Sequence, residues 1–105
     1  METGKKRITP WRVEYANKAK KQIEKLPPGM RDIFYILERE LGQEGPRQTE
    51  WRNYGLIVNA RDVHHCHLNN NHPRYVVVWK VVDHEKKSIE IRFVGTHGGV
   101  DYSRF

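Results

Sequence analysis

The stretch YVVVWKVV, residues 75–82, decides the fold, because it is apolar at every position except Lys80. A short apolar run that is rich in valine is typical of a β-strand. The next run, residues 88–94, alternates apolar and charged side chains and predicts a second strand. Residues 83–87 between the two runs have the length and composition of a hairpin loop. We therefore expect the two strands to pair antiparallel.

Further strands are predicted upstream of this hairpin. Residues 63–68 and 55–59 are short apolar runs, and the tri-asparagine segment 69–71 has the composition of a hairpin loop. Near the start of the chain, residues 11–15 alternate apolar with charged side chains, which is the period of a half-buried strand. The later runs should together form an antiparallel meander.

Two helices are predicted between the first strand and the meander. Residues 16–26 carry apolar side chains three and four positions apart with lysines on the remaining face, and Asn17 is the expected N-cap. The Pro-Pro-Gly segment 27–29 should end this helix, since proline and the residue before it disfavour helical geometry. Residues 30–41 repeat the amphipathic pattern, and the glycines and proline of segment 42–46 should end it.

The order of these elements predicts an α+β fold. The N-terminal strand and the two-helix hairpin should pack on one face of a mainly antiparallel sheet of four to five strands. A chain of 105 residues has the size of one domain, so we expect a single domain over residues 10–105 after a flexible basic leader, residues 1–9. The sheet face that the helices leave free is the expected place for a functional site.

The composition is basic. Nineteen Lys and Arg residues against thirteen Asp and Glu residues give a formal net charge of +6 and a pI near 9.6. This balance favours a polyanionic partner such as nucleic acid or an acidic protein. A basic surface that serves only solubility has the same composition, and composition alone does not distinguish the two.

Cys66 is the only cysteine, which excludes an internal disulfide and fits a reducing cytosol. We expect it to be a small buried hydrophobe. No run reaches the apolar length of a membrane span, and residues 1–9 lack the apolar region of a secretion signal. The expectation is a cytoplasmic protein with no membrane partner.

The densest group of titratable side chains is His-His-Cys-His at residues 64–67, and His97 follows at the end of the last predicted strand. Side chains alternate between the faces of a strand, so His65 and His67 should share one face. A lone histidine in a strand is more often a half-buried structural residue than a catalyst. These three rank above the other histidines because they recur at strand positions that a sheet can bring together.

Histidine and arginine, which are common in this region, are residue types suited to cleaving an RNA phosphodiester. This cleavage needs a base for the 2′-hydroxyl proton, an acid for the leaving 5′ oxygen, and positive charge on the transition state. Histidine suits the first two roles because its ordinary pKa of about 6.5 is close to the working pH. Arginine suits the third through bidentate phosphate contacts, and Arg74 begins the strand beside the histidines, with Arg92 and Arg104 as further candidates.

Aromatic side chains near the C-terminus are candidates for base stacking. Tyr102 and Phe105 lie in a polar tail, where they have less reason to be buried, and single-stranded RNA is commonly held by stacking on aromatic rings. Trp79, among valines, is expected to be part of the core.

A metal ion is an alternative use of the same histidines. His65-x-His67 with the distant His97 is a known way to hold zinc or iron on a sheet. The sequence lacks the Cys-x-x-Cys and His-Glu-x-x-His frameworks that identify zinc sites. A metal-bound enzyme is therefore the minor alternative.

Four segments carry a resemblance to a known family: WRNYGL at 51–56, HCHL at 65–68, PRYVVVWK at 73–80 and VGTH at 94–97. With the order of strand, two helices and sheet, the chain resembles the RelE/ParE toxin superfamily from Trp11 to its C-terminus, and the YafQ-like branch most closely. The resemblance implies a ribosome-dependent ribonuclease that cuts messenger RNA and is held inactive by a cognate antitoxin.

The resemblance also implies roles for matching residues. His67 matches a catalytic histidine of the YafQ-like motif, and His97 matches the histidine of its Gly-Thr-His segment. Tyr102 or Phe105 matches its C-terminal aromatic residue.

The chain departs from this branch at several positions. His65 stands where an acidic residue is common, Arg74 stands where the branch has an aspartate, and the insert 69–72 is longer than the usual turn. The acid–base assignment therefore does not transfer whole. A ParE-like relative that inhibits DNA gyrase shares the fold without the nuclease residues.

The sequence thus favours the toxin of a type II toxin–antitoxin system, a ribosome-dependent endoribonuclease that needs no metal or other cofactor. Its expected partners are a cognate antitoxin and messenger RNA on the 70S ribosome. The alternative is a non-catalytic binder of the same fold, either gyrase-inhibiting or inactive. The expected catalytic residues, with base and acid unassigned, are His67, His97, His65 and Arg74, and the expected substrate-binding residues are Arg92, Tyr102, Phe105, Lys80 and Arg104.

Overall fold

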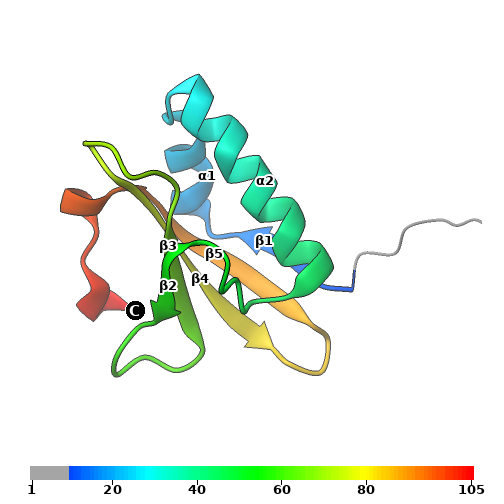
Figure 1. The fold of residues 1–105 in the computed structure, drawn as a ribbon. Helices are drawn as coiled ribbons and strands as arrows, with labels where there is room; N and C mark the ends of the chain where they lie inside the picture. Colours follow the sequence, from blue (N-terminus) through cyan, green and yellow to red (C-terminus); the bar gives the residue numbers. More distant parts are fainter. Residues whose placement is uncertain (1–9) are drawn as a thin grey trace, which may run out of the picture.

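The computed structural model describes residues 10–105, and in it two helices pack on one sheet of five strands (Figure 1). The strand order is β1-β5-β4-β3-β2, with β5 to β2 antiparallel and β1 parallel to β5. The predicted α+β fold is confirmed, and the predicted leader lies outside the described residues. The elements are β1 (Arg12–Tyr15), α1 (Asn17–Glu24), α2 (Pro28–Glu44), β2 (Arg52–Leu56), β3 (Val63–His67), β4 (Tyr75–Asp83) and β5 (Ser88–Thr96), followed by single 3-10 turns at His97–Gly99 and Tyr102–Arg104.

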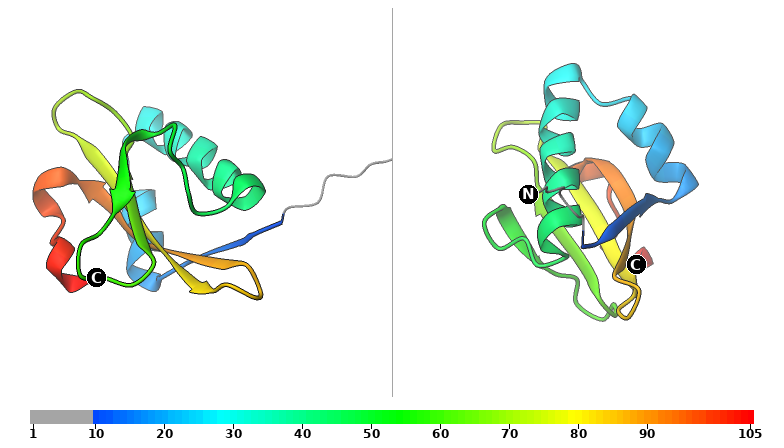
Figure 2. Two further views of the ribbon diagram at one scale, coloured as in Figure 1. Left: turned by 60° about the horizontal axis from the view of Figure 1, so that its bottom comes forward. Right: turned by 90° about the vertical axis from the view of Figure 1, so that its right-hand side faces the viewer.

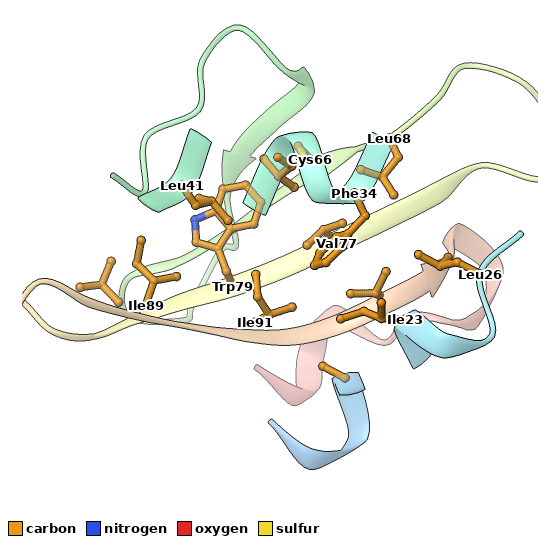
Figure 3. Close-up of a cluster of buried hydrophobic side chains, with 14 residues drawn as sticks. Ile23, Leu26, Phe34, Leu41, Cys66, Leu68, Val77, Trp79, Ile89 and Ile91 are labelled. Atoms are coloured by element: carbon orange, nitrogen blue, oxygen red, sulfur yellow. The ribbon is translucent and has the colours of Figure 1, made fainter. Parts of the chain in front are cut away.

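Both helices cover the same face of the sheet (Figure 2). Ile23 of α1 and Phe34 and Leu41 of α2 pack against the central strands in the larger of two cores (Figure 3). Trp79 of β4 is fully buried in this core, as predicted, and its indole N–H donates to the carbonyl oxygen of Pro46 at 3.1 Å. This buried apolar surface holds the helices on the sheet.

A smaller core lies on the opposite face, built from apolar side chains of β3, β4 and β5 and from Ile57. The C-terminal segment, residues 97–105, runs on the side of the sheet away from the helices (Figure 1). Tyr102 and Phe105 pack against the smaller core, and both are partly buried. The expectation of an exposed polar tail was wrong for these two residues, because the free sheet face offers apolar surface that the tail covers.

The helix boundaries correct two details of the prediction. Asn17 is the first residue of α1, and the residue before it takes the N-cap position. α2 begins at Pro28, because a proline is tolerated in the first turn, where its missing N–H is not needed. It continues past Gly42 and is capped by Gly45, whose φ of 96° suits glycine. Within residues 10–105, no helix is both long and apolar enough to span a bilayer.

Strand β2 departs furthest from the sequence pattern. It covers Arg52–Leu56, whereas the apolar run predicted a strand at 55–59. The rest of that run belongs to the β2–β3 connection, residues 57–62, in which Asn59 and Asp62 have φ values of 65° and 55°. Ile57 is apolar because it is buried in the smaller core, not because it belongs to a strand. The other strands match the predicted runs to within two residues at each end.

Candidate active site

Strand β3 divides its side chains between the two faces of the sheet. His65 and His67 face the free side, whereas His64 and Cys66 face the helices, as strand alternation predicts. The free side of β3 is therefore where candidate catalytic histidines gather.

The two side chains on the helix side are structural. The ring of His64 lies parallel to that of Trp79 at 5.8 Å, and its Nδ1 is 2.8 Å from the hydroxyl oxygen of Tyr54. Burial lowers the pKa of His64 to about 4 and raises the pKa of the Cys66 thiol to about 12. Both are uncharged near neutral pH, and Cys66 is the buried hydrophobe that the sequence predicts.

His97 meets His67 across the end of the sheet. β5 ends at Thr96, and the backbone N–H of His97 donates to the carbonyl oxygen of Arg74 at 2.7 Å, which ties the two segments together. The His67 and His97 rings make an edge contact, with centroids 5.4 Å apart and planes at 70°. Two imidazoles at this separation reach the same phosphodiester group.

Tyr102 extends this group along the sheet. Its ring centroid is 5.3 Å from that of His65 and 6.4 Å from that of His97. We call His65, His67, His97 and Tyr102 the histidine cluster. The C-terminal turn thus completes a site whose other members come from β3 and from the end of β5.

The cluster holds two imidazoles in the neutral form. The pKa of His67 lies below the ordinary value of 6.5, first because of burial and then because a positive charge on the nearby His97, His65 or Arg74 disfavours its protonation. Burial and then His97 lower the pKa of His65. At neutral pH both rings therefore have a nitrogen free to accept a proton.

Arg74 lies beside the cluster on an ordered loop. It is exposed, and it lines a hollow of about 230 Å³ together with His97 and their neighbours. Asn69 braces this loop: its Oδ1 accepts from the N–H of Tyr75 at 2.9 Å, and its Nδ2 donates to the carbonyl oxygen of Pro73 at 3.2 Å. The sequence analysis missed this role. The signal was an asparagine at the start of a loop, where its side chain commonly bonds nearby backbone.

A second brace comes from α1. β1 pairs with β5 only as far as Ile91, and farther along β5 the side-chain oxygen of Gln22 accepts from the N–H of Val94 at 2.8 Å. This bond fixes the last residues of β5 before His97. The sequence analysis missed Gln22, because a half-buried glutamine on a helix carries no local signal for a partner in a distant strand.

Three further predicted substrate-binding residues are not members of the histidine cluster. Arg92 pairs with Glu90 on the same strand. Lys80 is opposite Val63, four residues along β3 from His67, which is about 13 Å at the usual rise of a strand. Arg104 is exposed in the last 3-10 turn.

A larger cavity, of about 540 Å³, opens beside His65. Its walls are the β2–β3 turn, residues 56–60, and the C-terminal residues Tyr102, Ser103 and Phe105. His65 and Tyr102 therefore belong both to the histidine cluster and to this cavity.

The metal alternative gains no support from the geometry. Among residues 10–105, no three His, Cys, Asp or Glu side chains are arranged to hold a metal ion. The histidine cluster is an arrangement of ring contacts, which suits proton transfer.

Solved structures resemble the chain, whereas no protein-family model matches it and no curated protein is similar in sequence. A mutant of the toxin RelE from E. coli in the free state gives a TM-score of 0.68 at 19% identity, over 90% of this chain and 92% of that chain. This chain has the RelE fold. The archaeal RelE–RelB complex from Pyrococcus horikoshii gives 0.63 at 20% identity, over 87% and 99%.

The RelE fold also covers a more distant sequence. The YoeB dimer from Staphylococcus aureus gives a TM-score of 0.65 at 14% identity, over 84% of this chain and 98% of that chain. At such identities the likeness concerns the RelE fold and not individual residues. The YafQ-like assignment stays a prediction.

Proposed function

We propose that this chain is the toxin of a toxin–antitoxin pair and that it cleaves messenger RNA on the ribosome. The observation that carries the proposal is the edge contact between the His67 and His97 rings, 5.4 Å between centroids, on the sheet face free of helices. Proteins of the same fold include a RelE toxin and a complex of RelE with RelB. A fold hosts many functions, so the proposal rests on the paired imidazoles.

In the proposed reaction His67 is the general base, a role that its lowered pKa favours. Its neutral ring takes the proton from the 2′-hydroxyl, whose oxygen attacks the adjacent phosphorus. The bond between phosphorus and the 5′ oxygen breaks, and protonated His97 gives its proton to that oxygen. The products are a 2′,3′-cyclic phosphate and a free 5′-hydroxyl.

Arg74 is the proposed phosphate ligand. Its guanidinium lines the same hollow as His97, and a guanidinium stabilises the negative charge that gathers on the phosphate oxygens. The exposed position of Arg74 leaves it free to approach an incoming chain. Arg92 is less suited to this role because Glu90 partly neutralises it.

The proposed partners follow from the shape and charge of the free face. The hollow at Arg74 and His97, about 230 Å³, holds a single phosphate group and not a length of RNA. A ribosome that presents messenger RNA in a fixed conformation supplies the missing positioning. The net charge of +6 attracts both RNA and an acidic antitoxin segment that would cover the face.

Two substitutions test the proposal. His67→Ala and His97→Ala should each lower the cleavage of ribosome-bound messenger RNA by about 10²–10⁴-fold, the usual share of one acid–base group, and should abolish growth arrest on expression. His84→Ala is the matched control, because His84 is exposed, bonds Asp62 at 3.1 Å and lies outside the cluster. Circular dichroism and thermal melting establish that each variant is folded.

Growth arrest that persists in both folded variants would contradict the proposal. It would favour the non-catalytic binder of the same fold. Expression would then leave messenger RNA intact and, for a gyrase-directed protein, induce the DNA-damage response.

A further inference from the structure

One exposed histidine borders the hollow beside Arg74 and has no part in the cleavage step described above. This hollow of about 230 Å³ is lined by three ionisable side chains, those of His72, Arg74 and His97. We call it the phosphate hollow. Arg74 and His97 already have proposed roles, so His72 is the one ionisable side chain of its lining without a role.

We propose that His72 is a second ligand of the phosphate that is cleaved, and that its ring N–H donates a hydrogen bond to a non-bridging oxygen of the group that Arg74 holds. This inference rests on the proposed function, because it adds a catalytic residue to the same site. An imidazole has at least one N–H in both its neutral and its protonated form, so the donor is present in either state.

The backbone on both sides of His72 is held in place. The side-chain Nδ2 of Asn69 donates to the carbonyl oxygen of Asn71 at 3.3 Å and to that of Pro73 at 3.2 Å. These two carbonyls belong to the residues directly before and after His72. The imidazole of His72 is exposed, but it is therefore carried by a loop of defined shape.

The same loop is joined to the end of β5. The backbone N–H of His97 donates to the carbonyl oxygen of Arg74 at 2.7 Å, and both residues line the phosphate hollow. His72 thus stands on one side of a small space that has the proposed general acid on the other. A phosphate group in this space is within reach of both imidazoles and of the guanidinium.

The pKa of His67 distinguishes His72 from the residues that transfer protons. A positive charge on Arg74 is among the causes that lower this pKa, whereas His72 is not among them. His72 is therefore outside the pair formed by His67 and His97. Its position suits a hydrogen bond to the phosphate and not removal of the 2′-hydroxyl proton.

The surroundings of His72 also differ from those of the structural histidines. The ring of His64 is stacked on Trp79, and exposed His84 bonds Asp62 at 3.1 Å. Within residues 10–105, none of the hydrogen bonds uses the imidazole of His72. Its N–H is thus available to a ligand. Donors fixed beside a reacting phosphate stabilise the negative charge of the transition state.

The test separates the hydrogen-bond donor from the bulk of the ring. His72→Ala removes the donor, and His72→Gln keeps an N–H on a side chain of similar reach. His84→Ala is the matched control, because it removes an exposed imidazole that lies outside the phosphate hollow. Thermal melting establishes that each variant is folded.

The substrates are three ribosome-bound messenger RNAs that differ only at the cut. One is normal, and in each of the other two a different non-bridging oxygen of the cleaved phosphate is replaced by sulfur, which is a poor hydrogen-bond acceptor. The measurement is the rate of cleavage in a single turnover.

We expect His72→Ala to slow cleavage of the normal RNA by about 10–10²-fold, less than the loss of a fully buried donor because His72 is exposed. His72→Gln should recover most of the rate. With one of the two sulfur-containing RNAs, the loss caused by His72→Ala should shrink, because the sulfur has already weakened the same contact. His84→Ala should match the unaltered protein on all three RNAs.

An unchanged rate in folded His72→Ala would overturn the inference and leave the proposed function intact. An equal loss on all three RNAs would also overturn it, because His72 would then act without contacting the phosphate. Absence of cleavage by the unaltered protein on the ribosome would remove the proposed function itself, and the inference with it.

Discussion

His65 and His67 share one neighbour that lowers the pKa of both rings. Burial is the largest cause in each case, and the positive charge of His97 is the next. A positive charge at His97 therefore disfavours protonation of both His65 and His67.

Removal of His97 tests this effect. In His97→Ala the pKa values of His65 and His67 should both rise, and both should stay below 6.5 because burial persists. The measurement is an NMR titration of the imidazole resonances. His84→Ala should change neither value, since His84 is not among the groups that lower the pKa of His65 or His67. Unchanged titration of His65 and His67 without His97 would show that the rings do not interact.

His64 makes stability depend on pH. Its pKa is about 4 in the folded chain, chiefly through burial, and about 6.5 in an unfolded chain. Between these values the unfolded chain binds the proton and the folded chain does not, so stability falls as pH decreases from 6.5 to 4. The shift corresponds to a loss of about 3 kcal/mol in the free energy of unfolding between pH 6.5 and pH 4, and this stability is fully present above pH 6.5.

Urea unfolding of His64→Gln at pH 7, 5.5 and 4.5 measures this contribution. The variant should lose less stability than the unaltered protein over this interval, because glutamine does not titrate. Equal losses in the two proteins would show that His64 is not the buried neutral residue described above.

Near its C-terminal end, β5 is hydrogen-bonded by a side chain of α1 in place of the neighbouring strand β1. β1 stops pairing with β5 at Ile91, and Gln22 of α1 bonds Val94 in its place. Gln22 is therefore a positioning residue for His97, which follows three residues later. α1 thus acts on the site from the opposite face of the sheet.

Gln22→Leu should leave the Val94 N–H unpaired and lower the free energy of unfolding by about 1–3 kcal/mol. It should also lower kcat for cleavage with little change in KM, since His97 is displaced and binding groups are not. Gln22→Glu should restore kcat, because a carboxylate accepts the same hydrogen bond. Equal loss in both variants would reject the positioning role.

Hydrophobic periodicity predicted most of the elements but not where β2 lies. Strand and helix periods are local properties of the sequence, and β4, β5 and both helices follow them. β2 did not follow its hydrophobic pattern, because the apolar residues 57–58 lie in the turn after the strand. Their position is set by tertiary packing and not by the local sequence. The N-cap at Asn17 was also misplaced, since boundaries depend on bonds that the pattern does not specify.

At the scale of the whole molecule, the two faces of the sheet carry different features. The helix face holds the large core, and the free face holds the smaller core, the histidine cluster and the cavity between residues 56–60 and 102–105. The alternation of β3 predicted which histidines share the free face. The cavity between residues 56–60 and 102–105 could not be predicted, because its two walls come from segments that are distant in the sequence.

The contact between His67 and His97 was expected from the resemblance and from strand order, but its geometry was not. That geometry depends on two hydrogen bonds. The backbone bond from His97 to Arg74 joins segments that are distant in sequence, and the bond from Tyr75 to the Asn69 side chain lies within the β3–β4 loop. Such bonds have no periodic signature. Lys80 and Arg104 stay predicted substrate-binding residues, and Lys80 lies about 13 Å along the sheet from His67 at the usual rise of a strand.

The central claim is that His67 and His97 cleave RNA through the 2′-hydroxyl of the nucleotide before the cut. The most direct measurement uses ribosome-bound messenger RNA with a single 2′-deoxy substitution at that nucleotide. The account predicts no cleavage at the substituted position and normal cleavage at an unsubstituted position, ending in a 2′,3′-cyclic phosphate. Cleavage of the substituted RNA at the normal rate would contradict it.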